Sequence, residues 1–264
     1  MGEIQLVDAH CHLDELERRG MPAEEAISAA AAAGVLQMVT SGDSPAENHR
    51  ARELAETYQG VYFTPGWHPN NGRAPSGAER RELRDLLAHP RAVALGEVGL
   101  DYHQRDGGTI WDPGEQRSLL RGMLELAAEV GKPVVIHQRD AGWELLEVLD
   151  ASPRVPTMLH CFSGGAGFAQ AAVSRKLHCS FAGNLTFRSA AELREAVLAV
   201  PPELLLLETD SPFLAPHPLR GRLCHPALVR LTASWLAGHL GMELELVAKR
   251  SSSAARAFFQ LPPP

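Results

Sequence analysis

Short apolar runs alternate along this chain with longer stretches in which apolar residues recur every three or four positions. Most of the short runs are continuously apolar, as strands are in a parallel sheet that is covered on both faces. Eight of them have the composition and the flanking turn residues expected of strands. Their ranges are 4–10, 35–42, 61–69, 92–101, 133–137, 157–162, 178–184 and 204–212.

The stretches between these runs are rich in Ala, Leu, Glu and Arg and have the period of amphipathic helices. Pro22, Pro45 and Pro226 stand near the first turns of three of them, where the missing backbone N–H of proline costs little. The expected helices span roughly 22–33, 45–59, 76–89, 114–130, 142–150, 166–176, 189–200, 226–240 and 243–259.

Eight strand-then-helix units within 264 residues favour one architecture. We expect an α/β fold, a single closed (β/α)8 barrel of the TIM type with its active site at the C-terminal strand ends. An open doubly wound sheet is the rival, but no GxGxxG motif follows the first strand to support it. Because composition shows no linker-like break, residues 1–264 are expected to form one domain, with 260–264 as a loose tail.

The net charge of −7 limits the partners that the chain can bind. It disfavours tight, sequence-independent binding to duplex DNA, which depends on many Lys and Arg contacts to phosphates. It admits a nucleic-acid end that is held mainly through bound cations. The sequence shows no signal peptide or membrane span, and its four cysteines lack a paired spacing. We therefore expect a cytoplasmic monomer with reduced thiols and no membrane or stable protein partner.

Side chains that bind metals gather where the expected strands end. In a (β/α)8 barrel the C-terminal strand ends converge on one mouth, so residues far apart in sequence meet there. Five histidines and four carboxylates at such a mouth exceed what one ion needs, and they suit a hydrolytic centre with two metal ions about 3.5–4 Å apart. The residues concerned are His10, His12, His68, Glu97, Asp101, His137, His160, Glu208 and Asp210.

The segment DAHCH at 8–12 gives the densest signal. Side chains alternate along a strand, so Asp8, His10 and His12 are expected on one face and Ala9 and Cys11 on the other. A lone histidine in a strand is usually a hydrogen-bonded structural group. Two histidines on one strand face indicate a shared role as ligands.

Other residues at strand ends need partners as well. His137 and His160 each end an apolar strand, where an unpartnered imidazole would be costly to bury. Asp210 follows a run of leucines, so its carboxylate needs a cation or strong hydrogen-bond donors. Cys161, beside His160, is expected to face the helices as a small buried hydrophobe.

Six motifs along the chain resemble those of the TatD-family metal-dependent deoxyribonucleases, which belong to the amidohydrolase-like metal hydrolases on (β/α)8 barrels. They follow the family order and cover about residues 4–260: DAHCHLD, GWHP, GEVGLDY, PVVIHQRDA, LHCFSGG and LETDSPFL. The resemblance implies that His10 and His12 bind one metal ion and that His137 and His160 bind a second. It implies that Glu97 bridges the two ions.

The same resemblance implies roles for the residues around these ligands. Asp210 would bind metal and orient or deprotonate the attacking water, so that Glu97 and Asp210 are the expected catalytic carboxylates. His68 and Arg139 would contact the scissile phosphate. Asp101 would support the ligands, and Glu208, which shares the strand face of Asp210, is expected to do the same.

The activity implied by the resemblance is hydrolysis of a phosphodiester, from the 3′ end of single-stranded DNA, with RNA as a further substrate. The implied cofactors are two divalent cations, for which Mg, Mn and Zn are the candidates. One alternative is an ester or amide hydrolase, such as a deacylase acting on aminoacyl-tRNA, because a bridged pair of ions also activates water against carbonyls. A second alternative is a metal-binding scaffold without catalysis, although a structural site would close its coordination shell.

Two positions depart from the family pattern. In RGRLCHP (220–226), Cys224 stands where the family commonly has Asn, which affects the expected packing and substrate contacts of this loop. Trp67, beside His68, replaces a smaller residue. Its indole could stack on a base, but strand alternation with His68 favours packing away from the mouth.

Overall fold

The computed structural model describes residues 4–104 and 110–264, and in this part of the chain eight parallel strands follow the predicted order. A helix or a helical turn follows each strand, as the alternating pattern predicts. The strands are β1 (Leu6–Cys11), β2 (Val35–Gly42), β3 (Val61–Pro65), β4 (Leu95–Asp101), β5 (Val134–Arg139), β6 (Thr157–Leu159), β7 (His178–Phe181) and β8 (Leu205–Leu207).

Hydrogen bonds join the strands in two parallel groups, β1-β2-β3 and β4-β5-β6-β7-β8. Isolated parallel bridges connect the groups. Phe63 of β3 pairs with Ala92 just before β4, and Cys11 of β1 pairs with Ser211 beyond β8. These bridges close the sheet, which confirms the TIM-type barrel that the sequence predicts.

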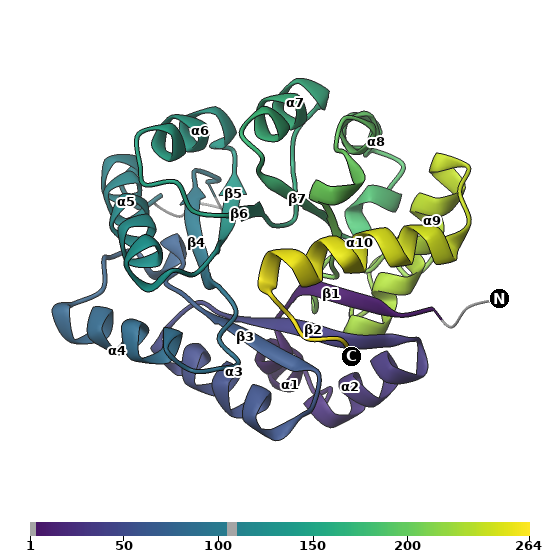
Figure 1. Ribbon diagram of the computed structural model, residues 1–264, viewed down its shortest axis with the longest axis horizontal. Helices are drawn as coiled ribbons and strands as arrows, with labels where there is room; N and C mark the ends of the chain where they lie inside the picture. The colour runs from purple at the N-terminus through teal and green to yellow at the C-terminus, as the bar shows by residue number, and fades with distance from the viewer. Residues whose placement is uncertain (1–3, 105–109) are drawn as a thin grey trace.

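Helices surround the strands as a ring (Figure 1). The bounds of the nine expected helices agree with the structure to within a few residues, and the short α1 and the 3-10 turns were not expected. The helices are α1 (Leu13–Arg18), α2 (Ala23–Ala32), α3 (Pro45–Thr57), α4 (Gly77–Leu87), α5 (Pro113–Val130), α6 (Gly142–Asp150), α7 (Ala166–Ser174), α8 (Ala191–Leu198), α9 (Val229–Leu240) and α10 (Leu244–Phe259), with 3-10 turns η1 (Pro69–Asn71), η2 (Gly183–Thr186), η3 (Pro202–Leu204) and η4 (Pro226–Leu228).

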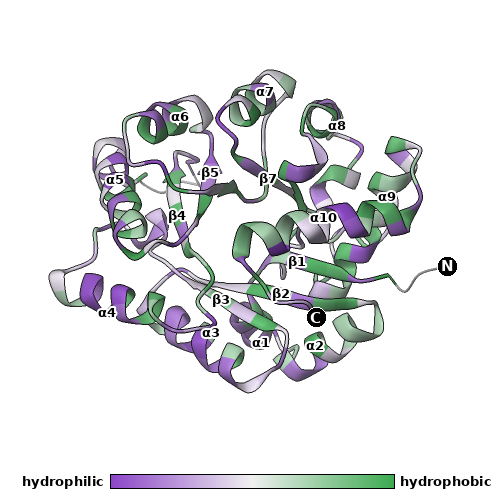
Figure 2. Cartoon of the chain, in the orientation of Figure 1, coloured by the Kyte–Doolittle hydropathy of each residue, from purple (hydrophilic) through white to green (hydrophobic). Residues whose placement is uncertain are grey.

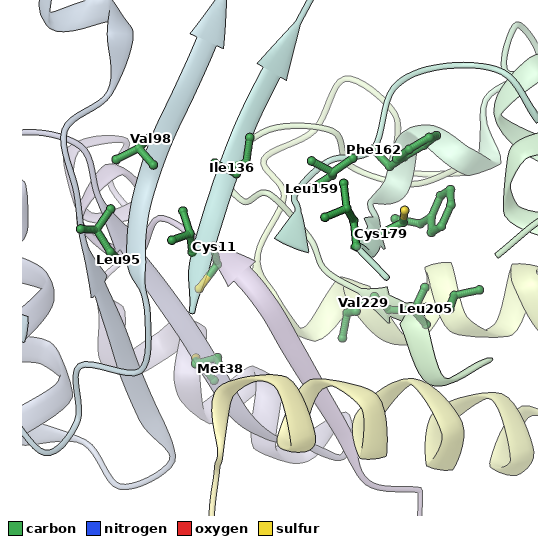
Figure 3. Close-up of a cluster of buried hydrophobic side chains, with 14 of the residues drawn as sticks. Cys11, Met38, Leu95, Val98, Ile136, Leu159, Phe162, Cys179, Leu205 and Val229 are labelled. Atoms are coloured by element: carbon green, nitrogen blue, oxygen red, sulfur yellow. The ribbon is translucent and has the colours of Figure 1, made fainter. Parts of the chain in front are cut away.

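An apolar layer lies between the strands and the surrounding helices. Figure 2 shows hydrophobic residues on the strands and hydrophilic ones concentrated on the outer helix faces. Figure 3 shows part of this layer, to which Val98 of β4, Ile136 of β5 and Leu159 of β6 belong. Burial of such side chains stabilises the fold by about 1.5–3 kcal/mol each.

A second apolar layer fills the barrel end that holds the strand N-termini. Val7, Val135 and Leu206 from three strands pack there with Phe258 of α10. In Figure 1, α10 lies across this end, in front of β1. The layer closes one end of the barrel, so a solute can reach the strand ends from the opposite face.

The last residues of the chain are anchored at this closed end. Leu261 is buried in the same apolar layer, and the carbonyl of Pro262 accepts a hydrogen bond from Gln37 Nε2 at 2.9 Å. Arg256 Nε donates to Gln37 Oε1 at 2.8 Å. The expectation of a loose tail at 260–264 is therefore wrong for Leu261 and Pro262, because both have partners in the barrel.

Among the described residues, no helix has both the length and the apolarity that a membrane span requires.

Candidate metal centre

The C-terminal strand ends bring two pairs of histidines, and His68 as a fifth, around one buried carboxylate. Glu97 of β4 is 3% exposed. Its Oε1 lies 2.7 Å from both His137 Nδ1 and His160 Nε2. Its Oε2 lies 3.4 Å from His10 Nε2 and 3.7 Å from His12 Nε2. Each oxygen of Glu97 therefore faces its own pair of histidines.

The nitrogens within each pair also lie close together. His10 Nε2 is 3.1 Å from His12 Nε2, and His137 Nδ1 is 3.3 Å from His160 Nε2. Two imidazole nitrogens that face each other at this distance need a proton or a metal cation between them, because their lone pairs repel. The arrangement fits cation binding at each pair.

In three of these histidines, the second ring nitrogen points away from Glu97 and faces another carboxylate. Glu208 Oε1 lies 3.5 Å from His160 Nδ1, and Asp101 Oδ2 lies 3.4 Å from His137 Nε2. Glu208 Oε1 also accepts a hydrogen bond from the backbone N–H of Cys161 at 2.7 Å, which fixes its position. A carboxylate placed in this way holds the proton on the outer nitrogen and leaves the inner nitrogen free to bind metal.

Asp43 provides the third such carboxylate, and sequence reasoning missed it. It follows β2, and its Oδ2 lies 3.8 Å from His12 Nδ1. Burial alone would lower the pKa of His12, but Asp43 and Asp210 outweigh it and raise that pKa to about 10. The signal that could have identified Asp43 is its place directly after an apolar strand, the rule that identified the other residues.

Asp210 lies just beyond β8 and faces the first pair of histidines. Its Oδ1 is 3.6 Å from His12 Nε2 and 3.8 Å from His10 Nε2. The backbone has a positive φ of 52° at this residue, and its N–H donates to the carbonyl of His10 at 3.0 Å. This left-handed conformation is unfavourable for a residue other than glycine, so the surrounding structure must stabilise it.

The charges within the centre shift the pKa of its central carboxyl group. Burial would raise the pKa of Glu97, but the neighbouring histidines, His160 foremost, hold it well below its ordinary value. Burial and the charge of His160 lower the pKa of His10. Glu97 is therefore ionised and provides the negative charge that a cation at either pair would face.

The two expected phosphate contacts lie in different parts of the site: His68 is buried in the centre, and Arg139 is exposed at its edge. His68 Nε2 lies 3.4 Å from Glu97 Oε1, within the centre itself. Its Nδ1 accepts a hydrogen bond from the N–H of Asn70 at 3.0 Å, so a neutral ring bears its proton on Nε2 and acts there as a donor. Arg139 ends β5, is exposed, and has no ion-pair partner among the described residues.

A cavity of about 830 Å³ lies over the centre. Its wall includes Asp43 on the β2 side, Arg139 on the β5 side and Phe213 beyond β8. Phe213 is 42% exposed, and its ring lies edge-on to His12 with the centroids 6.3 Å apart. The cavity gives a ligand direct access to the buried histidines.

Two sequence expectations about orientation are wrong. Asp8 does not join His10 and His12: it is fully buried, and its carboxylate accepts hydrogen bonds from Thr209 N at 2.8 Å and Thr209 Oγ1 at 2.6 Å. Strand pairing is irregular between Asp8 and Cys11, which breaks the simple alternation. Cys161 lines the cavity instead of facing the helices, because its φ of 43° turns the chain there.

The two departures from the family pattern are buried. Trp67 is 1% exposed, and its Nε1 donates to the carbonyl of Arg73 at 2.8 Å, so it packs away from the cavity as strand alternation favours. Cys224 is fully buried with Sγ 3.9 Å from the carbonyl of Thr209. Cys11 is fully buried in the layer toward the helices, as expected.

Comparison with known proteins identifies the family. The family model described as TatD related DNase matches residues 7–260. The uncharacterized metal-dependent hydrolase TatD of Mycobacterium tuberculosis is 39% identical over 261 residues, which cover 97% of this chain and 98% of that protein. The 3′-5′ ssDNA/RNA exonuclease TatD of Klebsiella pneumoniae is 34% identical over 247 residues, 89% of this chain and 91% of that protein.

The fold is also that of solved TatD structures. The crystal structure of the TatD homolog YJJV from Escherichia coli superposes with a TM-score of 0.89 at 26% identity, covering 99% of this chain and 100% of that chain. A TatD-family hydrolase from Entamoeba histolytica shares the fold with a TM-score of 0.82 at 18% identity, over 98% of this chain and 99% of that chain. This chain belongs to the TatD family of metal-dependent hydrolases.

Proposed function

We propose that this hydrolase is a 3′-to-5′ exonuclease that acts on single-stranded DNA, with RNA as a further substrate, and that it uses two divalent cations. The observation that carries the proposal is the position of Glu97, whose two oxygens face two separate pairs of histidines. A carboxylate that bridges two ions is typical of centres that cleave phosphodiesters. The relative from Klebsiella pneumoniae, which is named a 3′-5′ ssDNA/RNA exonuclease, supports the choice of substrate.

The donor set suggests which residues would hold the cations. His10 and His12 would bind one ion together with Glu97 Oε2, and His137 and His160 would bind the other together with Glu97 Oε1. Imidazole and carboxylate ligands suit Zn and Mn, and Mg is the third candidate. When bound, the cations would supply an acidified water and polarise a phosphoryl oxygen.

Asp210 has the position of the proton acceptor in this scheme. Its carboxylate faces His10 and His12 and lines the cavity, so a water molecule between it and a substrate can lose its proton to Oδ1. No covalent intermediate with the protein is required.

His68 and Arg139 would stabilise the phosphate. A neutral His68 can donate from Nε2 to a substrate oxygen, and the guanidinium of Arg139 reaches the cavity without an acidic partner among the described residues. Positive groups fixed in place before the substrate arrives stabilise the negative charge that develops as the bond breaks.

A deacylase or another ester hydrolase is the second candidate function. A bridged pair of ions would activate water against a carbonyl as well as against a phosphodiester. Arg139 favours the phosphodiester, because an arginine that has no ion-pair partner among the described residues attracts a charged phosphate more strongly than a neutral ester. A metal-binding scaffold without catalysis does not agree with membership of a hydrolase family.

A digestion time course tests the proposal. Protein stripped with chelator would receive Mg²⁺, Mn²⁺ or Zn²⁺ and a single-stranded oligonucleotide labelled at its 5′ end, with Asp210→Asn in parallel. A metal-dependent ladder that shortens from the 3′ end in the wild type, and is absent in the variant, is the expected result. Protein that binds two ions but cleaves neither DNA nor RNA, while it hydrolyses an aminoacyl ester, would overturn the proposal.

A further inference from the structure

Trp143 stands out on the surface beside the cavity. Its side chain is 63% exposed, which makes it the most exposed large hydrophobic side chain in the described part of the chain. It lies in the first turn of α6, four positions after Arg139. An indole in this position offers a large flat surface to a ligand that leaves the cavity.

A column of buried aromatic rings holds Trp143 in place. The Trp143 ring meets Phe168 edge-on, with centroids 5.7 Å apart and an interplanar angle of 70°. Phe168 stacks on Phe162, with centroids 5.4 Å apart, and Phe162 lies 5.5 Å from Phe181 of β7. The exposed ring is therefore supported by the core and would lose little conformational entropy when a ligand stacks on it.

Two glycines make room for this column. A Cβ added at Gly142 would lie 3.0 Å from the tip of the Phe168 ring, and one at Gly164 would lie 2.8 Å from its Cδ1. Gly164 also has a φ of +146°, which side-chain-bearing residues rarely adopt. Both positions flank Phe168, so any larger residue there would displace the ring that supports Trp143.

The platform adjoins the cavity wall. Gln138 and Ser163 line the cavity and are hydrogen-bonded to each other, with Ser163 Oγ 2.9 Å from Gln138 Oε1. A Cβ on Gly142 would lie 3.3 Å from Gln138 Nε2, so the residue before Trp143 lies close to this wall. Trp143 therefore lies next to the side of the cavity that Gln138, Arg139 and Ser163 line.

Charge favours this exit for a nucleic acid. Arg139 has no ion-pair partner among the described residues, whereas Asp43 faces the cavity three strands away. The nearby acids are occupied elsewhere: Asp140 lies 2.8 Å from His103 Nδ1, and Glu144 lies 3.6 Å from Arg117 Nη1. Phosphates are therefore attracted toward the β5 side of the cavity.

We infer that Trp143 is a stacking platform for a nucleobase of the retained single strand, on the 5′ side of the phosphate that is cleaved. This inference rests on the proposed exonuclease function and adds a second contact point to it. Stacking needs only the flat face of a base, so the platform would grip every sequence alike. It would act on binding of the strand and leave the bond-breaking step unchanged.

Steady-state kinetics on a single-stranded DNA of about ten nucleotides, with the metal that activates the wild type, test the inference. Trp143→Ala is expected to raise KM by roughly 5- to 100-fold, the range that one stacked base provides, with kcat nearly unchanged. Trp143→Phe should retain most of the affinity. Leu198→Ala, which removes an apolar side chain that is 61% exposed on α8, is the matched control and should leave KM unchanged.

A scan with single abasic nucleotides locates the contact. Omission of the base at one position from the 3′ end should raise KM for the wild type but not for Trp143→Ala. An unchanged KM for Trp143→Ala, or abasic effects that are the same in both proteins, would overturn the inference while leaving the exonuclease intact. Absence of any cleavage by the wild type would instead overturn the proposed function, and the stacking role with it.

Discussion

The two ends of the barrel are built by the same strands from opposite kinds of side chain. On β5, Val135 belongs to the apolar layer under α10, and His137, two residues later, faces Glu97. Met158 of β6 and His160 just beyond it repeat this step. Because residues two apart share a strand face, two residues along one strand separate the apolar end from the metal-binding end.

The two ends differ in the kind of polar group that they bury. At the closed end the buried amide of Gln37 has partners for both its oxygen and its nitrogen. At the open end, His10 Nδ1 and Glu208 Oε2 are buried and have no hydrogen-bond partner among the described residues. Asp210 and Cys161 there have a positive φ, a conformation that costs of order 1–3 kcal/mol for such residues. The apolar end stabilises a fold whose other end buries histidines and carboxylates close together.

Glu97→Gln should have the largest effect of these changes, a loss of activity at the open end of the barrel. The substitution keeps the shape of the side chain and removes the charge that faces both histidine pairs, so kcat/KM is expected to fall by about 10²–10³-fold or more. Metal content by plasma mass spectrometry and initial hydrolysis rates would measure the effect, with circular dichroism to verify folding. A variant that keeps both ions and the wild-type rate would refute the role given to Glu97.

Phe258→Ala should have the opposite effect, at the other end. Phe258 is 4% exposed within the layer under α10, and its loss should lower the free energy of unfolding by about 3–5 kcal/mol. The activity of the folded enzyme should stay within about twofold, since distant sites behave independently. Urea titration and rates at 25 °C would measure both, with Phe258→Leu as the milder control. An unchanged stability would show that this end contributes little to the fold.

Metal binding should stabilise the protein through the open end alone. At a free cation concentration of 100 times Kd, the free energy of unfolding should rise by about 2.7 kcal/mol for each bound ion, because the ions bind only the folded state. Thermal melts with and without cation would show the shift in the wild type and in Phe258→Ala. The same shift in Glu97→Gln would mean that the stabilising ion binds elsewhere.

Asp43→Asn should produce the smallest of these effects. It tests whether the carboxylate of Asp43 positions His12 at the open end. Loss of the carboxylate beside His12 Nδ1 should weaken metal binding by about 10–100-fold, the range seen for groups that orient a metal ligand. Asp140→Asn is the control, since that exposed carboxylate lies at the same face but pairs with His103. Equal metal affinities for the two variants, by competition with a chromogenic chelator, would count against the positioning role of Asp43.

The elements and most of the metal centre can be predicted from the sequence for a simple physical reason. Parallel strands buried on both faces produce apolar runs, and a polar residue that ends such a run stands out, as His137 and His160 do. The barrel rule then brings all such residues to one face without knowledge of any contact. The same rule predicts that Glu97 lies at this face. It does not predict that Glu97 lies between the histidines.

What the sequence did not reveal depends on backbone geometry or on distant contacts. Asp43 stands in the segment GDSP, where an aspartate is equally typical of a turn, so its approach to His12 is visible only in three dimensions. The orientation of Cys161 follows from a φ of 43° that no sequence pattern encodes. Leu261 has the sequence context of a frayed end, and only the structure shows that it packs in the apolar layer under α10.

Anomalous diffraction from crystals grown with Mn²⁺ would test the central claim most directly. Two peaks about 3.5–4 Å apart, one beside His10 and His12 and the other beside His137 and His160, with Glu97 between them, are the predicted result. A single ion, or ions bound without contact to Glu97, would contradict the account.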